Sequence, residues 1–265
     1  MHNTFKTFSL LCLLSYNLFS SNTLLAGGPL IIGGADGHTP VTYKEPNVTV
    51  HAESGTLGTL SNQEANAMLR EAFALWNNIT TSSINLIVDP APGATPTINV
   101  DITIDNYDEY LPAADGINYN ADDDLNPVVY DNNGEIIDLL LGQGQSDYTV
   151  GLAASIFNVG GEYFLKGYVI LNGKDLGQSD TVVKLLISHE IGHFFGLDHS
   201  QLDINNQEKD FGIPGLCKTE VPGRYPVMYP FICRNTVSLH GDDISAVSAL
   251  YPVASTNDNY GILQG

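Results

Sequence analysis

Three histidines and one glutamate lie within the stretch HEIGHFFGLDH, which begins at His189. Residues four positions apart share a helix face, so His189 and His193 can offer ring nitrogens to the same metal ion. Gly196 can end that helix in a left-handed conformation and turn the chain back, so that His199 supplies a third ligand. Three protein ligands leave a fourth position for water, as at a catalytic zinc ion. Glu190 is close enough along the helix to act on that water as a general base.

The stretch has to be presented by a buried helix. Ser179 or Asp180 is expected to cap this helix, and apolar side chains along its length would anchor it to a sheet. Ser61 followed by Glu64 forms a capping box, which predicts the start of a second helix with Trp76 on its inner side. Runs rich in apolar residues predict strands over residues 48–52, 84–88, 97–104 and 163–171.

The histidine motif resembles that of the metzincin metalloproteases, and further segments resemble their matrixin branch, the matrix metalloproteinase-like proteins. Ser200 follows the third histidine as in matrixins, and Met228 in the segment PVMYP is similar to their methionine turn. The segment 151–157 looks like their edge strand, and 239–251 like their last helix. The resemblance covers roughly residues 42–252. The alternative interpretation, a helix with solvated histidines, requires all of these matches to be accidental.

This resemblance implies an α+β fold of the zincin type. The expected domain has a twisted, mostly parallel five-stranded sheet with an antiparallel edge strand, three main helices, and an active-site cleft over the histidine helix and the methionine turn. It also implies a zinc-dependent endopeptidase, in which one Zn²⁺ is bound by His189, His193 and His199 and Glu190 is the general base. The peptide or protein substrate would lie extended along the edge strand. The residues expected to line its binding site are Leu152, Ala153, Leu185 and Pro230.

Two features depart from the family pattern. The cysteine switch of the vertebrate-type propeptide is missing, and so are the histidines of the structural zinc cluster. If the enzyme is made latent, Asp36 is a candidate to place a carboxylate on the zinc ion.

Clustered acidic residues suggest a second metal. Carboxylates and amides around glycine turns suit Ca²⁺, which takes six to eight oxygen ligands, and binding of Ca²⁺ is common in the family that the chain resembles. The alternative is a solvated acidic loop. The candidate calcium ligands are Asp122, Asp124, Asp131, Asn133, Glu135 and Asp138.

The chain divides into four segments. Residues 1–26 read as a signal peptide, 27–46 as a short leader or propeptide, 47–253 as the catalytic domain, and 254–265 as a tail or linker. We therefore expect a secreted protein, or a periplasmic or cell-surface one; a retained anchor is the alternative. Two cysteines remain after cleavage, and Cys217 and Cys233 are expected to form a disulfide rather than stay as free thiols.

The charge is strongly acidic, with 10 Lys and Arg against 30 Asp and Glu. Such a surface repels phosphates, so nucleic acid and anionic lipid are discounted as partners, and no stable membrane insertion is expected after signal cleavage. We expect a monomer. The main alternative function is a calcium-dependent surface or binding protein on a decayed protease scaffold, and a metalloenzyme acting on a non-peptide bond is a third.

Overall fold

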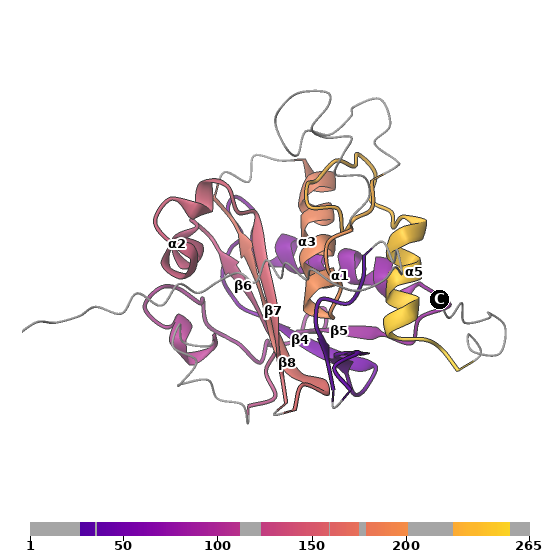
Figure 1. Cartoon of the computed structure of the whole chain (residues 1–265). Coiled ribbons are helices and arrows are strands. Elements are labelled where there is room, and N and C mark those ends of the chain that lie inside the picture. The colour runs from indigo at the N-terminus through magenta and orange to yellow at the C-terminus, as the bar shows by residue number, and fades with distance from the viewer. Residues whose placement is uncertain are drawn as a thin grey trace, which may run out of the picture.

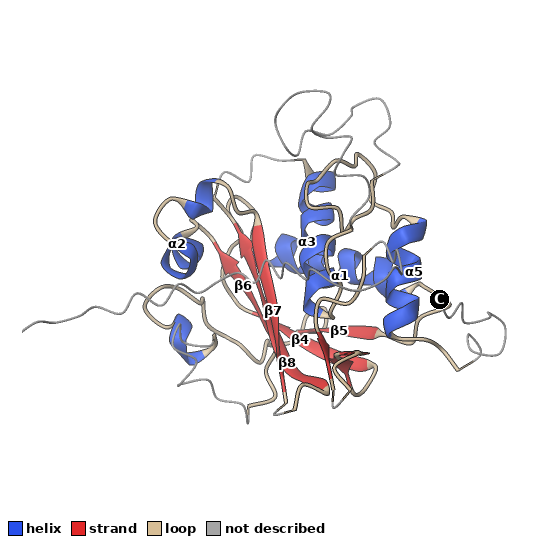
Figure 2. Cartoon of the chain, viewed as in Figure 1, coloured by secondary structure: helices blue, strands red, loops and turns tan. Residues whose placement is uncertain are grey.

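The computed structural model describes residues 27–254 except 35, 112–122, 159, 175–178 and 201–224. The described part is α+β, with a mostly parallel sheet and four α-helices (Figure 1; Figure 2). The helices are α1 (Asn62–Asn77), α2 (Glu135–Leu141), α3 (Asp180–Phe194) and α5 (Gly241–Leu250). Two short 3-10 helices lie at Tyr107–Glu109 and Gln145–Asp147.

The main sheet has six strands, of which one pairs antiparallel. The order is β3-β8-β6-β4-β5, all parallel, and β7 pairs with β8 in the antiparallel sense. The strands are β3 (Thr42–Tyr43), β4 (Asn47–Ala52), β5 (Asn85–Asp89), β6 (Pro127–Asp131), β7 (Gly151–Phe157) and β8 (Tyr163–Asn172). The expected mostly parallel sheet with one antiparallel strand is confirmed, and the two-residue β3 extends it beyond the five strands expected.

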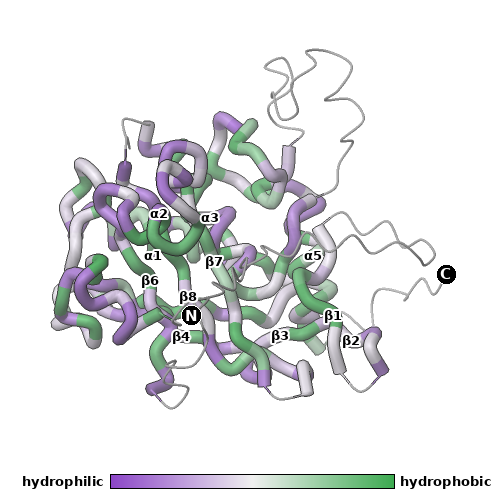
Figure 3. Tube along the Cα trace, turned by 60° about the vertical axis from the view of Figure 1, so that its left-hand side comes forward, coloured by the Kyte–Doolittle hydropathy of each residue, from purple (hydrophilic) through white to green (hydrophobic). Residues whose placement is uncertain are grey.

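Both faces of the central strand β6 are buried, because helices or loops cover each of them. On β6, Val128 and Tyr130 belong to the core shared with α1 and α3, whereas Val129 belongs to a second core with Ile136 and Ile137 of α2. In Figure 1, α2 accordingly lies on the opposite side of the sheet from α1, α3 and α5. Figure 3 shows hydrophobic stretches along α3 and the strands, with hydrophilic stretches mainly in the outer loops.

Three local predictions were wrong or incomplete. Residues 97–104 form no strand; they run as a loop whose Ile98 and Ile102 fill the second core, so their alternation reflects a covering role rather than sheet pairing. The strand β6 was missed, since its apolar run is only a few residues long between acidic segments. The short helix α2 was also missed, so the described helices number four rather than three.

Helix α1 supports α3 from behind. Its capping box is present: Glu64 N donates to Ser61 Oγ at 3.4 Å, and Ser61 N donates to the Glu64 carboxylate at 2.9 Å. Trp76, fully buried, donates from Nε1 to the carbonyl of Ser188 in α3 at 3.1 Å. Because Ser188 precedes the first histidine of the motif, this bond fixes α1 directly against the helix that carries the candidate site.

The segment before the main domain packs onto it. Residues Ile32–Gly33 (β1) and Thr39–Pro40 (β2) form a small antiparallel ribbon, and Val41 is fully buried in the core. Leu30 N donates to Gly196 O at 2.7 Å, and Asp198 N donates to Gly28 O at 2.9 Å. The described residues of the predicted leader therefore bracket the turn that follows α3.

None of the helices within the described ranges is both long enough and apolar enough to span a bilayer.

Candidate metal centre

The histidine motif straddles the end of a buried helix. Helix α3 ends at Phe194, and Gly196 follows with a φ of +104°, which residues with a side chain rarely adopt. Gly196 N donates to His193 O at 3.0 Å, and Leu197 N donates to Gly192 O at 2.9 Å, so the last carbonyls of the helix are satisfied. The chain reverses at this turn, as expected, and returns His199 toward α3.

The three histidines converge through their Nε2 atoms. The His193 Nε2 lies 3.1 Å from that of His189 and 3.1 Å from that of His199, and the remaining Nε2 pair is 3.2 Å apart. A tetrahedral zinc ion with Zn–N bonds of about 2.0–2.1 Å holds its nitrogen ligands about 3.3 Å apart. Within the described residues, this is the one group of three or more His, Cys, Asp or Glu side chains placed to hold a metal ion.

Hydrogen bonds to the second ring nitrogen orient two of these histidines. His189 Nδ1 donates to Val227 O at 2.7 Å, and His193 Nδ1 donates to Leu197 O at 2.8 Å. Because a carbonyl oxygen only accepts, Nδ1 must carry the proton, and the lone pair of Nε2 then faces the centre of the triangle. His189 and His193 are therefore already in the tautomer that ligates a metal ion through Nε2.

The histidines are also kept neutral. Burial, together with the neighbouring His193 and His199, holds the pKa of His189 well below its usual value. Burial and the neighbouring His199 lower the pKa of His193 to about 4. Burial likewise lowers the pKa of His199. Neutral rings do not have to lose a proton before they bind a cation, so the site is suited to metal at neutral pH.

Glu190 follows His189 on α3, and its side chain lies against the start of β7. Its side chain is 4% exposed, and burial raises its pKa to about 8. A nearby divalent cation opposes this effect, because positive charge favours the ionised carboxylate.

The methionine turn packs directly under the motif helix. Met228 is 1% exposed, and a Cβ added to Gly192 would lie 2.1 Å from its Sδ. Only glycine therefore fits at position 192 with Met228 in this place. Ser200 N donates to Met228 O at 2.7 Å, which ties the turn to the residue that follows the third histidine.

Two adjacent aspartates at the start of α5 hold this arrangement from below. Asp243, 1% exposed, accepts from Val227 N at 2.9 Å, from Met228 N at 3.0 Å and from His240 N at 2.7 Å. Burial raises the pKa of Asp243, and these backbone donors oppose the rise. Asp242 accepts from Ser200 Oγ at 2.7 Å. The sequence had indicated both residues only as part of a helix resemblance; their contacts give them a role at the site.

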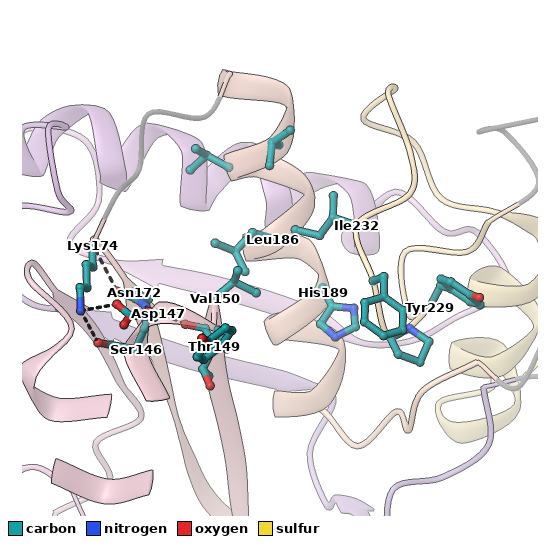
Figure 4. Close-up of a pocket in the computed structure, with 15 residues that line it drawn as sticks. Ser146, Asp147, Thr149, Val150, Asn172, Lys174, Leu186, His189, Tyr229 and Ile232 are labelled. Atoms are coloured by element: carbon teal, nitrogen blue, oxygen red, sulfur yellow. Dashed lines mark hydrogen bonds and ion pairs between the residues drawn. The ribbon is translucent and has the colours of Figure 1, made fainter. Parts of the chain in front are cut away.

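A cavity of about 510 Å³ opens beside His189 (Figure 4). Figure 4 shows His189 and Tyr229 at one end and Lys174 at the other, with Val150 and Leu186 between them. Lys174 Nζ lies 2.6 Å from the Asp147 carboxylate and 3.0 Å from Ser146 Oγ. The cavity thus has apolar walls near the histidine and a charged, hydrogen-bonded far end.

The expected substrate-site residues divide between two locations. Pro230 lines the cavity, but Leu185 does not: it is 2% exposed in the main core, and Leu186 lines the cavity instead. Leu185 and Leu186 are one helix position apart, a rotation of about 100°, and the role of Leu185 at a substrate site stays a prediction. Leu152 and Ala153 lie on β7, outside the cavity lining.

The candidate calcium ligands do not gather in the described structure. Asp131 is buried and accepts from Ile137 N at 2.9 Å in α2. Asn133 Oδ1 accepts from Glu135 N at 3.3 Å, and Asp138 accepts from Ser146 N at 2.7 Å. These oxygens satisfy local backbone donors around α2.

The remaining predicted site residues are settled only in part. Asp124 lies in the loop before β6, and Asp122 lies outside the described residues. Cys233 is disulfide-bonded. Its expected partner, Cys217, is also outside the described residues, so that pairing stays a prediction. The Asp36 carboxylate accepts from His38 N at 2.9 Å and from Thr39 N at 3.1 Å in an exposed turn. Asp36 is not part of the group of residues placed to hold a metal ion.

No family model and no curated protein matches this sequence.

Proposed function

We propose that this protein is a zinc-dependent endopeptidase of the metzincin type, similar to the matrixins, which cleaves internal peptide bonds of proteins. One observation carries the proposal: three Nε2 atoms lie 3.1–3.2 Å apart, and Glu190 directly follows the first of these histidines on α3. The buried Met228 beneath Gly192 supports this type of site over other three-histidine centres. Export through cleavage of residues 1–26 remains part of the proposal.

His189, His193 and His199 would hold the zinc ion through Nε2, which leaves one coordination position for water. Zinc bound in this way supplies a Lewis acid that acidifies the water and polarises a substrate carbonyl. Glu190 takes the proton from that water as it attacks and delivers it to the departing amine. Asp243 keeps the acceptor of His189 in place, because it binds both Val227 N and Met228 N.

The substrate would bind as an added strand. Strand β7 pairs with β8 along one edge, and in the described residues no strand pairs with its other edge. An extended peptide can hydrogen-bond to such an edge, with alternate side chains entering pockets. The cavity beside His189 is placed to receive a side chain next to the cleaved bond, and its walls near the histidine favour an apolar one.

Digestion of a general substrate tests the proposal. The protein lacking residues 1–26 is incubated with casein and with a peptide library, with and without a zinc chelator, beside Glu190→Ala, and bound zinc is measured by elemental analysis. We expect about one zinc ion per chain, internal cleavage that the chelator abolishes and added Zn²⁺ restores, and a loss of at least about a hundredfold in Glu190→Ala with zinc retained. Undiminished cleavage by Glu190→Ala, or a zinc-loaded wild type that cleaves nothing, would refute it.

A further inference from the structure

The first residue of β7 lies against the carboxylate of the general base. Gly151 pairs with Leu171 of β8, and helix α3 packs beneath this strand. A Cβ added at Gly151 would lie 2.7 Å from Cγ, 2.8 Å from Cδ and 2.9 Å from Oε1 of Glu190. Separations under about 3.0 Å between a Cβ and other heavy atoms are essentially never observed, so any side chain here must displace Glu190 or the strand.

The need for glycine at this position is one of space and not of backbone conformation. Gly151 is not among the glycines with positive φ, so alanine would suit its backbone. The three nearest atoms that a Cβ would meet all belong to the side chain of Glu190, which is itself 4% exposed and has little room to move.

We propose that Gly151 is a positioning residue for Glu190: the missing side chain at the start of the edge strand creates the space in which the catalytic carboxylate is held. The strand that would bind the substrate therefore lies in direct contact with the base that would act on the water. A Cβ at position 151 would push the carboxylate aside without touching a metal ligand. The catalytic consequence of this inference rests on the proposed function. The contact between Gly151 and Glu190 does not depend on it.

A double-mutant cycle tests the contact independently of any activity. Thermal unfolding is measured for the wild type, Gly151→Ala, Glu190→Ala and the double variant, each lacking residues 1–26. We expect Gly151→Ala to lower Tm by about 3 to 8 °C in the wild-type background, as overpacking does in a domain of this size. In the Glu190→Ala background the same change should cost nothing or raise Tm slightly, because the clash is gone and alanine restricts the unfolded chain.

Kinetics test the positioning role. For Gly151→Ala we expect kcat to fall by about ten- to a hundredfold, with KM and bound zinc within twofold of the wild type, because the base moves and the ligands do not. Gly241→Ala is the matched control, since a Cβ there meets nothing within 4 Å, and it should match the wild type.

Equal effects of Gly151→Ala on Tm in both backgrounds, or an unchanged kcat, would overturn the proposal. If the wild type shows no peptidase activity, the proposed function fails, and the thermal cycle still decides whether the contact exists.

Discussion

Asp243 links the methionine turn, a histidine of the candidate metal centre and helix α5 through one carboxylate. It accepts from Met228 N, and Val227 O of the same peptide group accepts from His189 Nδ1, so a single peptide group connects the Asp243 carboxylate to the histidine. Groups behind a metal ligand orient its ring, and their loss commonly weakens metal binding by tenfold or more. The pair Asp242 and Asp243 offers a direct comparison, because only the second carboxylate contacts this peptide.

We expect Asp243→Asn to lower the free energy of unfolding by about 1 to 3 kcal/mol, because an amide presents a donor to a backbone N–H that needs an acceptor. Zinc affinity should fall by about tenfold or more in the same variant. Chemical denaturation and competition with a chelator measure the two effects. Asp242→Asn, which loses only the acceptor of Ser200 Oγ, should show a smaller change in both; equal effects would remove the special role of Asp243.

The three histidines and Glu190 of the candidate site could be predicted because they lie close together in the sequence. His189, Glu190 and His193 share one helix, and Gly196 determines the return of His199, so spacing alone carries the information. The contacts of Asp243 and Gly151 could not be predicted, because they join positions 227 to 243 and 151 to 190 through the fold. The lining of the cavity could not be predicted for a different reason: Leu185 and its neighbour Leu186 are both apolar, and of the two only Leu186 lines the cavity.

Helix α3 is buried almost all round, so its position depends on what packs behind it. Trp76 of α1 packs edge-on against Phe195 with ring centroids 4.8 Å apart, and its Nε1 donates to Ser188 O. This side chain makes both a polar and an aromatic contact between α1 and the segment that carries the histidines.

We expect Trp76→Phe to lower the free energy of unfolding by about 1 to 3 kcal/mol, through the lost hydrogen bond and the space left by the smaller ring. Circular dichroism during chemical denaturation measures the change. Leu139→Ala on α2, where the leucine is 52% exposed, serves as the control and should stay within about 0.5 kcal/mol of the wild type. A Trp76→Phe variant as stable as this control would show that the helices do not depend on the indole.

A buried carboxylate joins the loop after β5 to the sheet. Glu53, at the end of β4 and fully buried, accepts from the backbone N–H groups of Ile102 and Tyr130. Burial raises its pKa from 4.5 to about 8, although both N–H groups favour the charged form. The folded protein therefore binds this proton more tightly than the unfolded chain does.

This shift predicts a pH-dependent stability. Between about 4.5 and about 8 Glu53 holds its proton more fully in the folded state than in the unfolded state, so the contribution of Glu53 to the free energy of unfolding should fall as pH rises through that window. Glu53→Gln should flatten this dependence, although the variant loses one acceptor and is less stable at low pH. Denaturation curves at several pH values measure the slope, with the exposed Glu45→Gln as control. An unchanged slope in Glu53→Gln would assign the pH dependence to other groups.

Helices and strands could be predicted where the hydrophobic pattern of a segment matches its structure. The prediction failed at residues 97–104 and at β6, where the pattern and the structure differ. The pattern of residues 48–52 and 163–171 predicted β4 and β8 closely, and the capping box predicted α1. Residues 97–104 alternate like a strand but cover the second core as a loop. Strand β6 is buried on both faces, so it lacks the alternation that would have revealed it.

At the scale of the whole molecule, the chain carries a formal net charge of −20 at pH 7. Such a field attracts cationic segments and repels anionic ones over distances comparable to the screening length. Substrate choice should therefore depend on residues well outside the pocket.

We expect a peptide with lysines flanking the cleaved segment to show a higher kcat/KM than the same peptide with glutamates. The ratio should shrink toward one as ionic strength rises from about 0.01 M to about 0.5 M, because salt screens the surface charge. Initial rates for the two peptides, measured in both buffers, provide the test. A preference that persists undiminished at high salt would have to come from direct contacts instead.

Trp76 is also the sole tryptophan among 265 residues. Light at the long-wavelength edge of protein absorption excites tryptophan but not the 13 tyrosines. Trp76 lies immediately behind Ser188, next to the first histidine, so the fluorescence excited in this way comes from the rear of the candidate metal centre. The untagged protein thus carries its own optical probe of this region, with which the arrival of a quenching transition metal can be followed in real time.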